Sequence, residues 1–346
     1  MARGAARAIA GPNIALSGRV TALAFSDDDG RLIAGDETGR YAVWDIGSGH
    51  LIYFATLPGA VGAVGLDASG IRFAADTDDA MVFGHVGDTP RQLSEQVLAS
   101  SLAFGTDSVT AADGRGRVVT WQLSTGKQIS DQGVGLGSPL ASAFTRDLRL
   151  FAGATLGNDP YIVDRVSGDN VVIDVGQTGV SIDEMAFDPS GSTLAIATRA
   201  GVLLWDVASK RLKSPVLAGI PGAHRPGSVS VEKGGRVVAA VGDRGVAVWN
   251  LNAEPPLVQT IEPTGISRLD QVPNVVRGAT STVFSPQGDL LAWTAIGARL
   301  SDGLFVVVWD LNSGRERPDS PASMSSRSAL KAIQSRRELS RTRKGW

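Results

Sequence analysis

The chain has 346 residues, is 43% hydrophobic and 20% charged, and contains 42 glycines, a composition typical of a soluble globular protein with many tight turns. The absence of cysteine excludes disulfides and thiolate metal sites, and only three histidines argue against a His-rich metal site. The formal net charge of −2 is unevenly distributed. Residues 321–346 contain seven basic residues and one acidic residue, a net charge of +6, which leaves −8 for residues 1–320. The acidic character of residues 1–320 argues against a surface that binds duplex DNA.

The first elements along the chain are a short N-terminal extension and a possible strand. Residues 1–12 carry Arg3 and Arg7, and Gly11 and Pro12 interrupt any apolar run, so we expect neither a secretory segment nor a membrane span. The expected location is therefore the cytoplasm. Residues 13–18 precede the first repeat and have no other obvious structural role.

One pattern recurs from residue 20 onward: an apolar strand, a polar turn, a second apolar strand, a Gly-containing turn, and a third strand ending in Trp-Asp or a relative. Clear copies span residues 20–49, 100–126, 183–210 and 280–314, and weaker copies end at Phe83-Gly84, Val163-Asp164 and Trp249-Asn250. The anchors fall at positions 44, 83, 121, 163, 205, 249 and 309, so most spacings are 38 to 44 residues. This period matches a four-stranded propeller blade.

The local patterns agree with that interpretation. Tyr41–Trp44 and Phe305–Trp309 are near-continuous apolar runs, which are typical of strands buried on both faces. A four-residue turn ending in glycine follows several anchors, at Gly49, Gly126 and Gly314, and glycine supplies the positive φ that such hairpins need. The predicted fold is therefore all-β: a seven-bladed propeller of four-stranded antiparallel blades over residues 13–320, followed by a basic C-terminal tail, residues 321–346.

The pairs Trp44-Asp45, Trp205-Asp206 and Trp309-Asp310, in phase with their upstream strands and turns, resemble the WD-repeat β-propeller family over about residues 13–320. The Gly-His pair that opens a typical WD repeat is absent from every copy. The family's Asp-His-Ser/Thr-Trp hydrogen-bond relay therefore cannot form, and blades must depend on packing and strand ladders. The Ala-, Gly- and Arg-rich composition suggests a standalone bacterial member.

A propeller needs its first and last blades joined, because an open edge strand invites aggregation. By resemblance to the family, a strand from one terminus should complete the blade made by the other. We expect residues 13–18 to form the outer strand of the blade that ends at Trp309. The competing segment, residues 315–321, contains Arg315, Glu316, Arg317 and Pro318 and makes a poor strand.

Three long connections point to one face. In an antiparallel blade, the connection between the second and third strands opens on the same face as the connection to the next blade. Ser214–Gly227, Glu262–Gly278 and Ala295–Gly303 all belong to that face near the last two blades. The candidate partner-binding residues are His224, Arg225, Arg268, Asp270, Asn274, Arg277, Ile296, Arg299, Leu300 and Asp302. The alternative is tolerated drift, since each doubling of loop length costs only about 0.6 kcal/mol.

Motifs that could carry chemistry are better explained as turns. Asp27–Gly30 and Asp76–Asp79 lack the spaced ligands and closing Glu of a calcium loop. Gly114–Arg117 precedes a strand and so offers no helix N-terminus to an anion. His50 and His85 lie at expected turns, where histidines are usually solvated. We therefore predict no catalytic residue, metal or cofactor.

The tail, Ser325–Trp346, has a weak helical spacing of Leu330, Ile333 and Leu339 among basic residues from Arg327 to Lys344. It could order on an acidic partner or an anionic membrane surface. The alternative is a solvated, disordered extension. For the whole chain we expect a monomeric, non-catalytic scaffold for protein–protein contacts. The alternatives are a propeller enzyme of lactonase-like or glycosidase-like type, or the sensor subunit of a larger signalling assembly.

Overall fold

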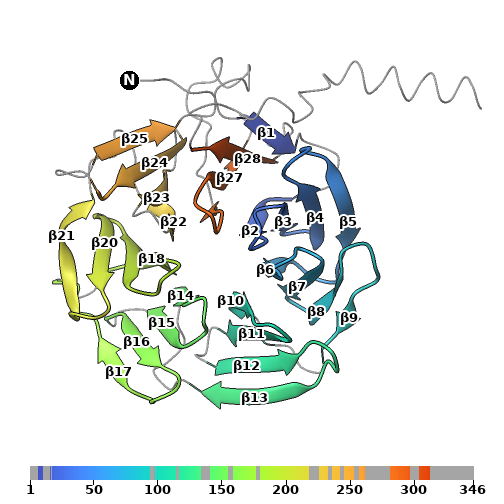
Figure 1. Cartoon of the computed structure of the whole chain (residues 1–346), viewed down its shortest axis with the longest axis horizontal. Coiled ribbons are helices and arrows are strands. Elements are labelled where there is room, and N and C mark those ends of the chain that lie inside the picture. The colour runs from blue at the N-terminus through green and yellow to red at the C-terminus, as the bar shows by residue number, and fades with distance from the viewer. Residues whose placement is uncertain are drawn as a thin grey trace, which may run out of the picture.

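The computed structural model describes residues 7–10, 16, 18–93, 97, 99–113, 117–133, 141–154, 159–176, 180–217, 226–232, 236–241, 245–252, 257–261, 281–296 and 304–311. Within these ranges every regular element is a β-strand, and the strands form four-stranded antiparallel sheets arranged in a ring (Figure 1). The molecule is a β-propeller.

The first three sheets are each made of four consecutive strands, ordered from the centre of the ring outward. Their bounds are β2 (Val20–Phe25), β3 (Arg31–Asp36), β4 (Arg40–Asp45), β5 (Leu51–Thr56); β6 (Val61–Leu66), β7 (Arg72–Thr77), β8 (Met81–His85), β9 (Arg91–Gln92); and β10 (Ala99–Phe104), β11 (Ser108–Asp113), β12 (Arg117–Gln122), β13 (Gln128–Gly133).

The next three sheets follow the same order. Their bounds are β14 (Ala141–Phe144), β15 (Leu150–Ala154), β16 (Tyr161–Asp164), β17 (Asn170–Val172); β18 (Ile182–Phe187), β19 (Thr193–Thr198), β20 (Gly201–Asp206), β21 (Arg211–Leu217); and β22 (Pro226–Val231), β23 (Arg236–Val241), β24 (Gly245–Asn250), β25 (Leu257–Ile261).

The remaining sheet combines an N-terminal strand with C-terminal strands and corrects the expected count of seven blades. Only six blades are continuous in sequence, from β2–β5 to β22–β25. The other sheet is a composite in the order β1-β28-β27-β26, with β26 (Thr282–Phe284), β27 (Leu290–Ile296) and β28 (Leu304–Asp310) from the C-terminal part. Its outer strand, β1 (Arg7–Ala10), comes from the other end of the described chain. The architecture is therefore six contiguous blades and one composite sheet.

The closing strand is not the one expected. Residues 7–10 pair antiparallel with β28, with Arg7 opposite Val308 and Ala10 opposite Val306, across a register shift. Residues 13–18 therefore do not provide the paired strand, and part of the segment 1–12 belongs to the propeller. The competing residues 315–321 lie outside the described ranges.

A second contact joins the first blade to the composite sheet. Asp29 lies in the turn between β2 and β3 and has a positive φ of 58°. Its carboxylate accepts a hydrogen bond from the Ser285 hydroxyl at 2.7 Å and one from the Gln287 main-chain N–H at 3.3 Å. The acidic turn Asp27–Gly30 is thus a structural turn, as its sequence indicates, and it joins segments that are about 256 residues apart.

Burial follows position within each blade. All six residues of β19 are buried, whereas the outer strand β13 is almost entirely exposed. The apolar runs that predicted doubly buried strands, Tyr41–Trp44 and Phe305–Trp309, lie in the third strands β4 and β28, and the second strand β3 is buried to a similar extent. Each blade therefore packs both its faces against its neighbours, which favours near-continuous apolar sequence.

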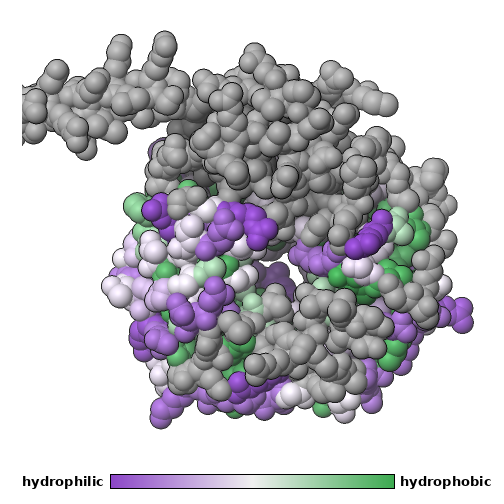
Figure 2. All heavy atoms as spheres, turned by 180° about the vertical axis from the view of Figure 1, so that it is seen from behind, coloured by the Kyte–Doolittle hydropathy of each residue, from purple (hydrophilic) through white to green (hydrophobic). Residues whose placement is uncertain are grey.

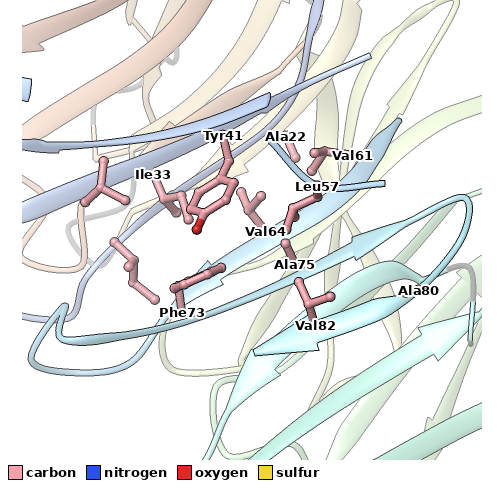
Figure 3. Close-up of a cluster of buried hydrophobic side chains, with 12 residues drawn as sticks. Ala22, Ile33, Tyr41, Leu57, Val61, Val64, Phe73, Ala75, Ala80 and Val82 are labelled. Carbon is pink, nitrogen blue, oxygen red and sulfur yellow. The ribbon is translucent and has the colours of Figure 1, made fainter. Parts of the chain in front are cut away.

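The core consists of apolar clusters between adjacent sheets. Between the first two blades, Tyr41 stacks on Phe73 with ring centroids 4.7 Å apart, and Ile33 and Val82 join them (Figure 3). Aromatic pairs of this geometry contribute about 0.5–1.5 kcal/mol beyond the area that they bury. The corresponding cluster between the first blade and the composite sheet includes Trp44.

The aspartate of the Trp-Asp pair shapes the turn that follows it. Asp45 Oδ1 accepts hydrogen bonds from the Ser48 main-chain N–H and hydroxyl, both at 2.7 Å. Asp206 accepts a hydrogen bond from the Ser209 N–H in the same way. Gly49 and Gly126 have the predicted positive φ, 69° and 70°.

The anchor tryptophans serve as core residues, as predicted from the repeats. Trp121 and Trp249 are at most 2% exposed, and the Trp121 Nε1 has no hydrogen-bond partner among the described atoms. Packing therefore holds this side chain in place.

Candidate functional site

The three long connections leave the described structure at one face of the ring. The flanking strand ends are Leu217 and Pro226, Ile261 and Thr282, and Ile296 and Leu304. In antiparallel four-stranded blades, these ends of the strands lie on one side, opposite the turns that follow the Trp-Asp pairs. This side is called the loop face below, and the other side the turn face.

Most of the candidate partner-binding residues fall outside the described ranges. These are His224, Arg225, Arg268, Asp270, Asn274, Arg277, Arg299, Leu300 and Asp302. The tenth, Ile296, is the last residue of β27 and pairs with Leu304 of β28. Ala295 and Ile296 therefore extend the strand, so the expected connection Ala295–Gly303 begins two residues later. The long hydrogen-bonded ladder between β27 and β28 accounts for this difference.

Buried hydroxyl groups join the strands beneath the loop face. Ser228 of β22 is fully buried, and its Oγ accepts a hydrogen bond from the Thr282 main-chain N–H at 3.0 Å. The Ser228 and Thr282 hydroxyls lie 3.1 Å apart. The Ser281 N–H donates to Thr294 Oγ1 of β27 at 3.3 Å. The described ends of two long connections are thus held to each other by direct hydrogen bonds.

A carboxyl group joins the same network from the preceding blade. Glu184 lies on β18, and its Oε2 accepts a hydrogen bond from the Val229 main-chain N–H at 3.0 Å. The Ser228 side chain also bonds to this carboxyl group. Burial raises the pKa of Glu184 to about 7, and these two hydrogen bonds only partly oppose that effect.

Glu184 faces a cavity in the central channel. The cavity has a volume of about 320 Å³ and is lined by Thr21–Phe25 of β2, Gly62–Val64 of β6, Leu102, Glu184, and Ser281, Val283, Phe284 and Pro286. Figure 2 shows a hollow near the middle of the ring on the face turned away from the viewer of Figure 1. Glu184 is the one ionisable side chain among the described lining residues.

An ion pair crosses the channel at the turn face. Arg146 Nη2 lies 2.5 Å from Asp27 Oδ2, and these residues occupy the innermost turns of the fourth and first blades. Because these blades are not neighbours, the pair must span the channel mouth. Access to the cavity is therefore more open from the loop face.

The described groups are poorly arranged for nucleophilic catalysis. The Ser228 hydroxyl is close to Glu184 but has no exposed surface, so a substrate could not reach it. His50 follows β4 in an exposed turn, and His85 ends β8 with its Nδ1 3.9 Å from Asp88. Within the described ranges, no three His, Asp or Glu side chains gather as metal ligands would.

Sequence reasoning missed Glu184 and Ser228. The sequence did contain a signal. Asp183 and Glu184 are two adjacent acids in an inner strand, and the equivalent positions in the first two blades are the uncharged pairs Thr21-Ala22 and Gly62-Ala63. A register shift falls at the same place in β18, between Ile182 and Glu184, as it does in β2 and β6. Bulges redirect side chains at strand ends, and that redirection cannot be seen in the pattern of apolar residues.

Comparison with protein-family models and with curated proteins finds no match to this chain. Among the described residues, no helix has the length and apolar character needed to cross a bilayer.

Proposed function

We propose that this protein is a non-catalytic scaffold that binds another protein through its loop face, near β22 and the composite sheet. The observation that carries the proposal is the hydrogen-bonded base formed by Glu184, Ser228 and Thr282 under the flanks of the long connections. Binding residues are often carried by long connections on a rigid scaffold. A fixed base reduces the conformational entropy lost when a partner binds.

The repeat pattern supports a finer assignment to the WD-repeat family. The Asp residues of the Trp-Asp pairs at 45 and 206 form turn hydrogen bonds, and the anchor tryptophans pack in the core. WD-repeat propellers commonly bind proteins, which agrees with the proposed function. The basic tail, residues 321–346, lies outside the described ranges, and its contact with an acidic partner stays a prediction.

Replacing one connection tests the proposal. We expect that substituting a four-residue Gly/Ser turn for residues 262–278 reduces recovery of the partner at least tenfold in a quantitative pull-down from the native host. The fold should survive, because long connections contribute little to stability. The melting temperature of the variant checks this point.

The matched control is a connection on the same face but away from the site. Residues 134–140 join β13 to β14 between the third and fourth blades. Their replacement by the same turn should leave partner recovery unchanged. Equal recovery with both variants, or equal loss with both, would contradict a binding surface near the composite sheet.

A further inference from the structure

The cavity beside Glu184 has features that a scaffold does not require. Its walls combine polar surface with apolar side chains, among them Leu23 and Val64 from two inner strands and Val283 from the composite sheet. Its volume of about 320 Å³ is at the lower end of the range for small-molecule sites, which is about 300–1,000 Å³. A carboxyl group beside these apolar side chains can orient a small ligand that has both a charged and an aliphatic part.

The carboxyl group is held in position before any ligand arrives. Val229 donates to Oε2 at 3.0 Å, and the Ser228 side chain provides a second hydrogen bond. A carboxylate has about four acceptor sites, so these two bonds leave capacity for further donors. Held in this way, the group loses little side-chain entropy on binding.

The charge on this carboxyl group is not balanced by a described cation. Within the described part of the chain, none of the salt bridges involves Glu184, and no basic group influences its pKa. Burial alone raises that pKa to about 7. A cation placed beside the group would favour its ionised form, because an opposite charge within about 4–6 Å stabilises the carboxylate.

We propose that the channel cavity binds a small organic cation, a primary ammonium group on an aliphatic body, with Glu184 as the counter-ion. The ammonium group would donate to the free acceptor sites of Glu184, and the aliphatic body would lie against Leu23, Val64 and Val283. The ion pair between Arg146 and Asp27 hinders the turn-face mouth, so the ligand would enter from the loop face.

Three six-carbon ligands, one positively charged, one neutral and one negatively charged, test this proposal on the unaltered full-length protein. In isothermal titration calorimetry at pH 7.5, we expect saturable binding of hexylammonium chloride. Hexan-1-ol should bind at least tenfold more weakly, and sodium hexanoate should not bind. Equal binding of the alcohol and the ammonium ion, or no binding of the ammonium ion, would overturn the proposal.

Two variants locate the site. Glu184→Gln keeps an acceptor for the Val229 N–H and should weaken hexylammonium binding at least tenfold. Asp76→Asn is the matched control: Asp76 is an acid whose pKa is likewise raised to about 7, but it does not line the cavity. Its affinity should equal that of the parent protein. An equal loss in both variants, or none in Glu184→Gln, would place the binding elsewhere.

The same titration with Nα-acetyl-lysine N-methylamide distinguishes two sources of the ammonium group. Affinity similar to that of hexylammonium would assign the site to a lysine side chain of a partner. Much weaker affinity would assign it to a free amine, because the blocked backbone would not fit the cavity. Should Glu184→Gln fail to fold, as judged by its circular dichroism, the ligand series on the parent protein still decides the proposal.

Discussion

Among single residues, Asp76 at the end of β7 has the clearest energetic consequence. The side chain is 2% exposed, and its Oδ2 accepts a hydrogen bond from the Ala99 N–H of the next blade at 2.6 Å. Its Oδ1 is buried without a hydrogen-bond partner among the described atoms. Burial is the main cause that raises the pKa of Asp76 to about 7, and the nearby charge of Asp78 adds to it.

This raised pKa predicts a pH-dependent stability. An unfolded Asp76 ionises near pH 4, whereas the folded one stays protonated up to about pH 7, so folding is favoured less as the pH rises between these values. Asp76→Asn removes this titration. We expect the variant to be more stable than the parent by about 1–3 kcal/mol above pH 7, the usual cost of a buried unsatisfied group. Near pH 4 this advantage should vanish.

Urea unfolding of both proteins at pH 4, 5.5 and 8 measures this difference. A constant gap between the two at all three pH values would contradict a titrating Asp76. Exposed Glu37, which contacts Arg19, supplies the control substitution Glu37→Gln. That substitution should change stability little at any pH, because exposed ion pairs contribute about 0–1 kcal/mol.

Residues in regular turns could be anticipated, and buried polar residues could not. Gly49 and Asp45 were identifiable because turn chemistry depends on a few adjacent residues. Lys210 shows the limit of this reasoning: it has a φ of 55° where other copies have glycine. The partners of Glu184 and Asp76 come from neighbouring blades, and their contacts depend on how blades pack.

At the scale of strands, the repeat period located nearly every element, but it did not identify the closing strand. Residues 7–10 and 13–18 are both short and partly apolar, and each lies close to the first repeat. Which segment pairs with β28 depends on the length of chain available to reach that strand and on the strand register. Local sequence does not encode either of them. The same reason explains why β27 extends to Ile296.

Deleting the closing strand should destabilise the whole ring. Removal of residues 1–10 would expose the outer edge of β28 and the side of the composite sheet. We expect the melting temperature to fall by at least about 3 °C, which corresponds to roughly 2 kcal/mol in a protein of this size. Differential scanning calorimetry measures the shift.

Removal of residues 1–6 alone is the control, because it leaves β1 in place. The two truncated proteins should therefore differ clearly in melting temperature. Identical values would mean that the pairing of Arg7 with Val308 contributes nothing to closure.

At the scale of the whole molecule, the sequence predicted a propeller because each repeat encodes its own strands and turns. It described the ring less well, since six blades are continuous where seven blades were expected, and residues 7–10 close the composite sheet in place of residues 13–18. The proposed binding side follows from the alternation of antiparallel strands, which places the flanking strand ends of the long connections on one face.

The most direct test of the binding function is photo-crosslinking from defined positions on the two faces. A photoreactive amino acid would replace Asn274 or Leu300, in the connections between strand ends at the loop face, and Lys127 or Lys210 at the turn face. In the native host, we expect the first two positions to crosslink to the same partner protein and the last two to give no such product. Crosslinks from Lys127 or Lys210 alone, or from none of the four positions, would contradict a protein scaffold that binds through its loop face.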